Sequence, residues 1–194
     1  MAFPPAALAS LAREVGSLLV AQNATLALCE TTTGGLITAT LLSTPGASRY
    51  CKGSTCSYSL GARKALNGFT SADYEGYKCA FARRAQTERP SGPTEAIVLK
   101  LAKSVQSSLG TTWAVSESGV CGPTLSPKYR AEIEVGYGPI AVVGPDGIER
   151  TRIVRNGHIE GENARAGHMV AFAVAALELL KTTLLERAPG PAKA

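Results

Sequence analysis

The chain has 194 residues, of which 45% are hydrophobic and 18% charged, and its formal net charge at pH 7 is +5. This length fits one globular domain with its own core, and the composition excludes disordered, collagenous and repetitive proteins. The five cysteines are scattered and form no C-x-x-C pair, which favours reduced thiols in a cytosolic protein. We therefore expect a cytoplasmic protein that holds neither a metal nor a cofactor.

Other classes of protein are disfavoured by charge and patterning. The N-terminus lacks a basic region, and Arg13 and Glu14 interrupt its apolar run, so no signal peptide is expected. We expect no membrane span, because no segment approaches roughly 20 apolar residues. Basic pairs occur without a dense basic run or interleaved aromatic residues, so a nucleic-acid surface is not expected. A small anionic ligand such as a phosphate would explain the positive bias equally well.

Helices and strands alternate through the first two thirds of the predicted order. In chain order we predict a helix over 6–23, a strand over 25–29, a helix over 34–43, a strand over 54–58, a short helix over 61–66, a helix over 94–108 and a strand over 112–118. Residues 68–92 show no clear period and are predicted to be a long loop with at most one short helix. Such loops are often functional or mobile.

The last third predicts a hairpin and a long helix. Apolar runs over 133–143 and 147–154 flank the sequence GPDG, which suits a tight turn. A regular apolar face predicts a final helix over 165–187, and residues 188–194 are expected to be a flexible tail. This order predicts one α/β domain over 1–187, built as a three-layer α/β/α sandwich around a mixed sheet.

Loops of small polar residues follow three of the predicted strands. Because ligands bind at the carboxyl ends of strands in open α/β sheets, these loops form the candidate site. The loops are Glu30-Thr31-Thr32-Thr33-Gly34-Gly35, Tyr58-Ser59 with Arg63 and Lys64 on the next helix, and Ser116 to Pro123 with Ser118 and Gly119.

Each loop has two interpretations. The helix after the first loop would offer free N–H groups and a positive dipole end to a phosphate or an oxyanion, or a threonine simply caps that helix. Tyr58 could supply a proton donor and Arg63 or Lys64 a cation, or the second helix is an ordinary basic surface. The third loop could donate hydrogen bonds to an anion or be a simple turn.

Together the three loops resemble the C-terminal domain of the competence/damage-inducible CinA family, which includes nicotinamide-mononucleotide deamidases. The resemblance covers nearly the whole chain in order and spacing. The family motif E-S-C-T-G-G corresponds to residues 30–35, Y-S-N-E-A-K to 58–63 and S-G-I-A-G-P to 118–123, and of a late G-D-R only Arg165 is kept. The chain is similar to the stand-alone form, without the extra N-terminal domain of longer members.

The resemblance implies metal-free hydrolysis of nicotinamide mononucleotide to nicotinic acid mononucleotide and ammonia. It places Thr31 at the family's serine nucleophile, Arg63 at its lysine and Tyr58 at its tyrosine. A threonine hydroxyl can attack a carbonyl, although its β-methyl group crowds the site. Arg63 stays protonated, so it can bind a carboxylate or phosphate but cannot be the base. Lys64 would replace it only if the helix shifts by one residue, and an extra residue between Gly53 and Tyr58 leaves that register open.

The other pocket residues are expected to bind substrate. They are Glu30, Thr32, Thr33, Gly34, Gly35, Ser116, Ser118, Gly119, Arg165 and His168. His168 is a surface or capping histidine, or alternatively a proton shuttle. Cys121 is expected to be a small buried filler rather than a nucleophile. The apolar last helix suggests self-association, as in the family, although a core helix would look the same.

Three functions remain open at this point. The first is an amide hydrolase with Thr31 as nucleophile. The second is a different enzyme on the same scaffold, in which Tyr58 and Lys64 or Arg63 act on a carbonyl substrate in a cyclisation or isomerisation of specialised metabolism. The third is a non-catalytic nucleotide-binding or regulatory protein. In each case we expect a nucleotide or carboxamide as partner, a homo-oligomer, and neither nucleic acid nor membrane.

Overall fold

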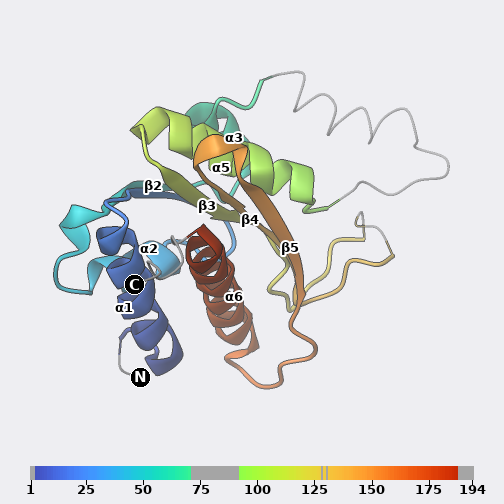
Figure 1. Cartoon of the computed structure of the whole chain (residues 1–194). Helices are drawn as coiled ribbons and strands as arrows, with labels where there is room; N and C mark the ends of the chain where they lie inside the picture. The colour runs from blue at the N-terminus through green and yellow to red at the C-terminus, as the bar shows by residue number, and fades with distance from the viewer. Residues whose placement is uncertain (1–2, 71–91, 128, 130, 188–194) are drawn as a thin grey trace.

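The computed structural model describes residues 3–70, 92–127, 129 and 131–187, and within them five strands form one mixed sheet (Figure 1). The strands are β1 (Leu26–Glu30), β2 (Cys51–Cys56), β3 (Trp113–Glu117), β4 (Tyr137–Val143) and β5 (Glu149–Arg155). Their order across the sheet is β2-β1-β3-β4-β5. β1 runs parallel to β2 and β3, whereas β4 is antiparallel to both β3 and β5.

Helices cover both faces of this sheet, as Figure 1 shows, which confirms the predicted α/β/α sandwich. The α-helices are α1 (Ala6–Ala21), α2 (Leu36–Leu42), α3 (Leu60–Asn67), α5 (Glu95–Leu109) and α6 (Ala164–Arg187), and the short 3-10 turns are η1 (Ala47–Arg49) and η2 (Pro145–Gly147). α1, α2 and α6 lie on one face, and α5 lies on the other with α3 beside it.

The central strands contribute to two cores. Trp113 and Val115 pack with α1, α2 and α6, whereas Ala114 between them packs with α5. This alternation follows from the two-residue period of a strand. Because both faces are covered, β1, β3 and β4 are buried at every position, and their sequences are mostly apolar rather than alternating, with polar residues at the carboxyl ends of β1 and β3.

β2 (Cys51–Cys56) is shifted at both ends from its predicted limits, which were 54–58. It begins at Cys51 and contains a bulge, since Leu26 pairs with Cys51 but Ala27 pairs with Gly53, leaving Lys52 as an extra residue. As an edge strand of mostly small and polar residues, β2 gives a weak hydrophobic signal. The other predicted elements agree to within a few residues, apart from the first strand of the hairpin, which begins at Tyr137. Residues 71–91 of the predicted loop, and the predicted tail, lie outside the described residues.

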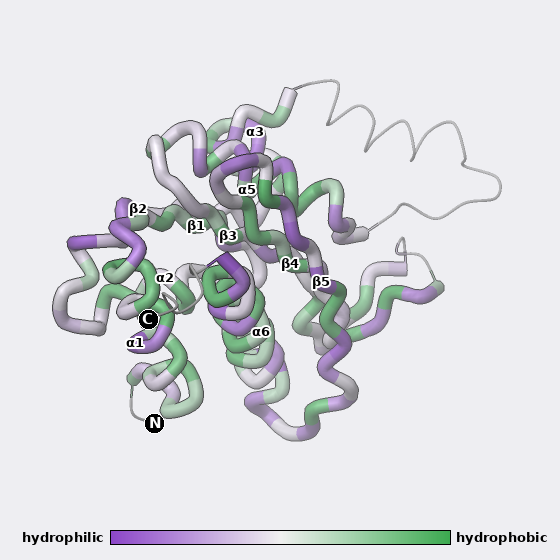
Figure 2. The backbone as a smooth tube through the Cα atoms, in the orientation of Figure 1, coloured by the Kyte–Doolittle hydropathy of each residue, from purple (hydrophilic) through white to green (hydrophobic). Residues whose placement is uncertain are grey.

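α6 corrects one expectation. Its 24 residues are long and apolar enough to cross a membrane by length and composition, contrary to the prediction that no segment comes near this limit. Figure 2 shows hydrophobic residues along much of this helix. Phe172, Ala176 and Leu180 are buried, the latter two in the core shared with α1, so packing inside the domain accounts for much of the apolar surface of α6.

Gly144→Ala is expected to destabilise the protein by about 1–3 kcal/mol through overpacking. A Cβ atom at Gly144 would lie 2.4 Å from Cζ3 of the buried Trp113, and the extended backbone there suits any residue, so the effect is purely steric. Chemical denaturation measures the loss. Gly61→Ala in α3 is the control, because its Cβ would come no closer than 3.7 Å to Ser59 Oγ. Equal losses in the two variants would contradict this account.

Candidate functional site

The three polar loops meet at the carboxyl ends of β1, β2 and β3. They enclose a cleft of about 140 Å³, to which the start of α6 also contributes. Its lining residues are Thr32, Tyr58, Gly119, Val120, Cys121, Gly122, Thr124, Ser126, Tyr129 and Arg165. The structure therefore brings residues of all three loops together with Arg165, which contacts Tyr58 across a sequence separation of 107 residues.

Glu30 organises the first loop from beneath. Its carboxylate accepts hydrogen bonds from the backbone N–H groups of Gly35 (3.0 Å), Ile37 (3.0 Å) and Thr38 (2.8 Å), and from two threonine hydroxyls. Only 1% of Glu30 is exposed. The start of α2 is thus capped by the protein's own carboxylate, which satisfies the free N–H groups and the positive end of the dipole. A glutamate rather than a threonine therefore caps this helix, and Glu30 does not line the cleft.

A second buried carboxyl group, Glu117, was not singled out from the sequence. Its Oε1 accepts hydrogen bonds from the backbone N–H groups of Thr31 (2.7 Å) and Thr33 (2.9 Å). Its Oε2 is buried and has no hydrogen-bond partner among the described residues. The available signal was a single acidic residue at the end of an otherwise apolar strand, a position where burial demands partners.

One threonine hydroxyl connects the two carboxyl groups. Thr33 Oγ1 lies 2.7 Å from Glu30 Oε2 and 2.8 Å from Glu117 Oε1. A hydroxyl has one proton, so both contacts are hydrogen bonds only if one carboxyl group is protonated. Burial raises the pKa of Glu117, and the charge of Glu30 adds to the rise, against the opposing effect of the loop N–H groups. Of the two carboxyl groups, Glu117 is therefore the one whose surroundings favour the shared proton.

The loop turns Thr32, rather than Thr31, toward the cleft. Thr31 is 2% exposed, and its hydroxyl donates to the backbone carbonyl of Glu117 at 3.0 Å. Thr32 lines the cleft, where its Oγ1 accepts a 2.6 Å hydrogen bond from the Gly119 N–H. The predicted nucleophile, Thr31, is thus not among the described residues that line the cleft, and its Oγ1 lies 3.2 Å behind the lining residue Thr32, measured to Thr32 Oγ1. Gly34 and Gly35 have φ values of 64° and 98°, which let the chain turn into α2.

The second loop settles the register between Arg63 and Lys64. Arg63 is buried, and its guanidinium donates to the Ser57 carbonyl (3.3 Å) and to Ser118 Oγ (3.1 Å). Lys64 is exposed on the other side of α3. Ser59 caps this helix by accepting from the Ala62 N–H. The inward position is therefore an arginine that connects the second and third loops.

Tyr58 and Arg165 form the open side of the cleft. Arg165 donates to the Gly122 carbonyl at 2.5 Å and to the Tyr58 hydroxyl at 3.2 Å. Tyr58 is 65% exposed, so a ligand can reach its phenol. The start of α6 thereby holds the second loop against the third.

Three other residues considered from the sequence have different surroundings. Ser116 is buried and donates to the Val98 carbonyl of α5 at 2.5 Å, so it faces away from the cleft. His168 is also buried, with no partner for Nδ1 among the described residues, and burial lowers its pKa. It does not line the cleft. Cys121 does, but burial raises the pKa of its thiol to about 11, which disfavours the reactive thiolate.

The lining carries few groups for proton transfer. Of the described residues that form the cleft, none is a carboxylate, a histidine or a lysine. The ionisable side chains of the described lining are those of Arg165, Tyr58, Tyr129 and Cys121. Within the same described ranges, no group of three or more His, Cys, Asp or Glu side chains is placed to hold a metal ion.

The fold and the cleft define an α/β domain with a candidate small-molecule site at the carboxyl ends of its parallel strands. The chain belongs to the CinA C-terminal domain family, whose sequence profile matches residues 8–184. This confirms the resemblance inferred from the three loops.

Named relatives agree with this assignment. A CinA-like protein of Desulfosudis oleivorans is 32% identical over 176 residues, covering 91% of this chain and 38% of that protein. A CinA-like protein of Salinibacter ruber is 32% identical over 172 residues, covering 88% and 36% respectively. The chain thus spans little more than a third of the length of these curated relatives.

Solved structures share the fold. The competence/damage inducible protein of Agrobacterium tumefaciens superposes with a TM-score of 0.77 at 22% identity, covering 95% of this chain and 99% of that one. The competence damage-inducible protein A of Klebsiella pneumoniae superposes with a TM-score of 0.75 at 18% identity, covering 93% and 98%. At these identities the likeness establishes the architecture alone.

Proposed function

We propose that this domain is a metal-free hydrolase of a carboxamide such as nicotinamide mononucleotide, with Thr32 as its nucleophile. The supporting observation is that a hydroxyl, a phenol and a guanidinium, those of Thr32, Tyr58 and Arg165, line one cleft. These groups suit acyl transfer, which needs a nucleophile, an acid for the leaving amine and a cation for an anionic part of the substrate.

The proposed reaction proceeds in two steps. Thr32 Oγ1 attacks the carboxamide carbon, and the C–N bond breaks as ammonia leaves with one added proton. Because Tyr58 accepts a hydrogen bond from Arg165, its own proton is directed elsewhere and can pass to the leaving nitrogen, while the Thr32 hydroxyl proton replaces it on the phenol, so that one proton is transferred in total. Water then hydrolyses the Thr32 ester, releasing the acid and restoring the hydroxyl. The Gly119 N–H fixes the position of Oγ1 throughout.

A second candidate function is nucleotide binding without turnover. It is favoured by the lack of a carboxylate, histidine or lysine among the described lining residues, since a base typically contributes about 10²–10⁴-fold to such reactions. The hydrolase proposal therefore predicts a slow enzyme.

Ammonia release from nicotinamide mononucleotide tests the proposal. Thr32→Ala is expected to lower the rate by about 10³-fold or more, as loss of a nucleophile does. Thr31→Ala is expected to lower it by no more than about tenfold, because it removes two supporting contacts, to the Glu117 carbonyl and to Thr32 Oγ1, and leaves the nucleophile in place. The two variants differ by a single neighbouring threonine and are purified in parallel, so a contaminating host amidase would appear equally in both.

The outcomes are distinct. A larger loss in Thr31→Ala than in Thr32→Ala would return the nucleophile to the position implied by the family motif. Saturable binding of nicotinamide mononucleotide to the wild-type protein, without ammonia release, would replace the hydrolase proposal with the second candidate.

A further inference from the structure

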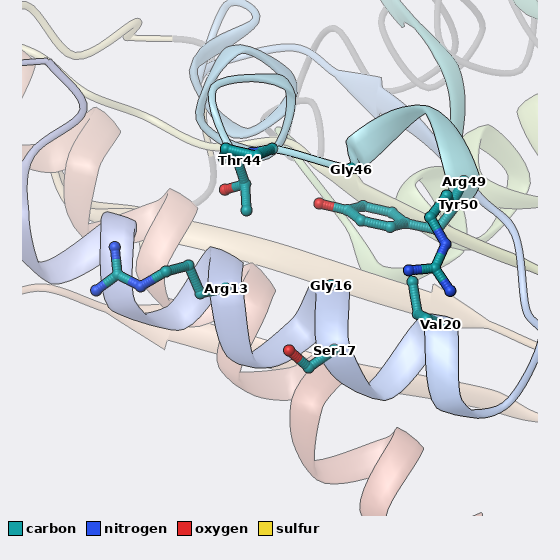
Figure 3. Close-up of a pocket in the computed structure, with 9 residues that line it drawn as sticks. Arg13, Gly16, Ser17, Val20, Thr44, Gly46, Arg49 and Tyr50 are labelled. Atoms are coloured by element: carbon teal, nitrogen blue, oxygen red, sulfur yellow. The ribbon is translucent and has the colours of Figure 1, made fainter.

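A second and larger hollow lies near the amino ends of β1 and β2, whereas the cleft lies at their carboxyl ends. It has a volume of about 340 Å³ and is formed by one side of α1 and the connection from α2 to β2 (Figure 3). Tyr50 in its wall precedes the first residue of β2, and its carbonyl accepts from the N–H of Leu26 at the start of β1. The cleft lies beyond the other ends of these strands, and the two sites share no lining residue.

A glycine and a buried tyrosine lie against each other in the wall of the hollow. Tyr50 is 2% exposed and forms part of the floor with Gly16 of α1. A Cβ atom at Gly16 would lie 2.9 Å from Tyr50 Oη, so a side chain at this position would overlap the tyrosine. The resulting volume is within the range of small-molecule sites in proteins, about 300–1,000 Å³.

Its charged groups are all of one sign. Arg13 and Arg49 line the hollow, and Figure 3 shows them toward opposite ends of it. No acidic residue is among the described lining residues. Glu14, which follows Arg13 in sequence, forms an ion pair with Lys181 of α6 and also feels the charge of Arg13. Within the described part of the chain, neither arginine has a hydrogen-bond or ion-pair partner.

The hollow also offers neutral donors. Ser17 and Thr44 line it from its two walls, and their hydroxyls have no hydrogen-bond partner among the described residues. An anion bound here would gain charge-assisted hydrogen bonds from guanidinium groups without breaking an existing ion pair. Val20, Pro45 and Tyr50 supply apolar wall for the body of such a ligand.

We propose that this hollow binds a small organic anion, through Arg13 and Arg49 with Ser17 and Thr44, at a site separate from the cleft. The anionic group is a phosphate or a carboxylate, since a guanidinium recognises both in the same bidentate way. The proposal goes beyond the hydrolase activity and does not depend on it.

Titration of the ¹⁵N-labelled protein with pyrophosphate and with citrate, followed by NMR, tests this inference. The amide signals of Gly16, Ser17 and Gly46 are expected to shift and saturate, with a dissociation constant of about 1 mM or lower at roughly 0.15 M ionic strength. Saturation by pyrophosphate alone would assign the site to phosphates, and saturation by citrate alone would assign it to carboxylates.

Substitutions decide whether the hollow or the net charge binds the probe. Arg13→Ala and Arg49→Ala are each expected to raise the dissociation constant by about tenfold. Both side chains are exposed and without partners, so the same spectra will show an intact fold. Arg150→Ala, which removes an exposed arginine of β5, is the control and should bind as the wild type does. An equal loss in all three variants, or no saturable shift with either probe, would overturn the proposal.

Discussion

Glu30→Gln is expected to destabilise the protein by about 3–5 kcal/mol, because several buried donors lose their acceptor at once. Five donors surround the Glu30 carboxylate, three at Oε2 and two at Oε1. A glutamine keeps one oxygen, so its NH₂ group must face N–H or hydroxyl donors in either orientation. The start of α2 also loses the negative charge that complements its dipole. Chemical denaturation at pH 7 measures the loss.

Glu117→Gln is the matched control, and its effect is expected to be small. The two backbone N–H donors to Glu117 both reach Oε1, and Oε2 has no hydrogen-bond partner among the described residues, so a glutamine can keep its oxygen at that place and gives up at most the contact with Thr33 Oγ1. At pH 5 we expect the variant to lie within about 1 kcal/mol of the wild type. A loss at neutral pH as large as that of Glu30→Gln would contradict the assignment of the shared proton to Glu117.

The stabilities of the wild type and of Glu117→Gln should also depend differently on pH. Burial raises the pKa of Glu117 in the folded state above its ordinary value of 4.5. The folded state then binds more protons than the unfolded state between these two values, so the free energy of unfolding falls as pH rises through that window. Glu117→Gln cannot titrate and lacks this fall. The variant should therefore gain stability relative to the wild type as pH rises above 4.5, and a constant difference would refute the explanation.

Arg63→Lys is expected to raise the rate of ammonia release by about 10²-fold, if the domain hydrolyses a carboxamide as proposed. Arg63 is buried beside Ser118, the neighbour of the Gly119 that holds Thr32. Its guanidinium stays charged and cannot accept a proton, whereas burial lowers the pKa of a lysine and makes a neutral amine accessible. The variant would thereby regain the base that the resemblance places at this position.

Arg63→Gln is the control that distinguishes the gain of a base from the mere removal of the arginine. It also removes the charge and can keep a hydrogen bond to Ser118, but it offers no basic nitrogen, so no rate increase is expected. Equal rates in the lysine and glutamine variants would show that this position does not supply a base. A stability measurement accompanies both, because each gives up part of the contact between the second and third loops.

Periodicity and turn residues predicted the architecture well. The apolar faces of α1 and α5 and the GPDG turn between β4 and β5 gave the layers, because burial imposes these patterns on any chain with this fold. The order of the polar loops was also sufficient to indicate where the candidate site lies, since the carboxyl ends of β1, β2 and β3 must meet at one edge of the sheet.

The direction of individual side chains could not be predicted. Three consecutive threonines look alike in sequence, and only the hydrogen bonds of the loop place Thr31 inward and Thr32 at the cleft. Likewise, the extra residue at Lys52 lies upstream of α3, so the sequence could not show whether Arg63 or Lys64 faces inward on that helix. Glu117 was overlooked because its partners are 84 and 86 residues away, a separation that no local pattern reveals.

Because of the contacts of Glu117 and Gly119, the first and third loops must be treated as one unit when the protein is engineered. Hydrogen bonds join three residues of the first loop, Thr31, Thr32 and Thr33, to Glu117 and Gly119, which are 84 to 87 residues away in sequence. If either loop is exchanged alone, buried hydrogen-bonding groups of the other loop lose their partners. A serine-containing first loop taken from a relative should therefore be transplanted together with the strand end that receives it. The second loop joins this unit through two arginines, Arg63 by its hydrogen bond to Ser118 and Arg165 by its hydrogen bond to Tyr58, so an exchange of this loop must keep both contacts.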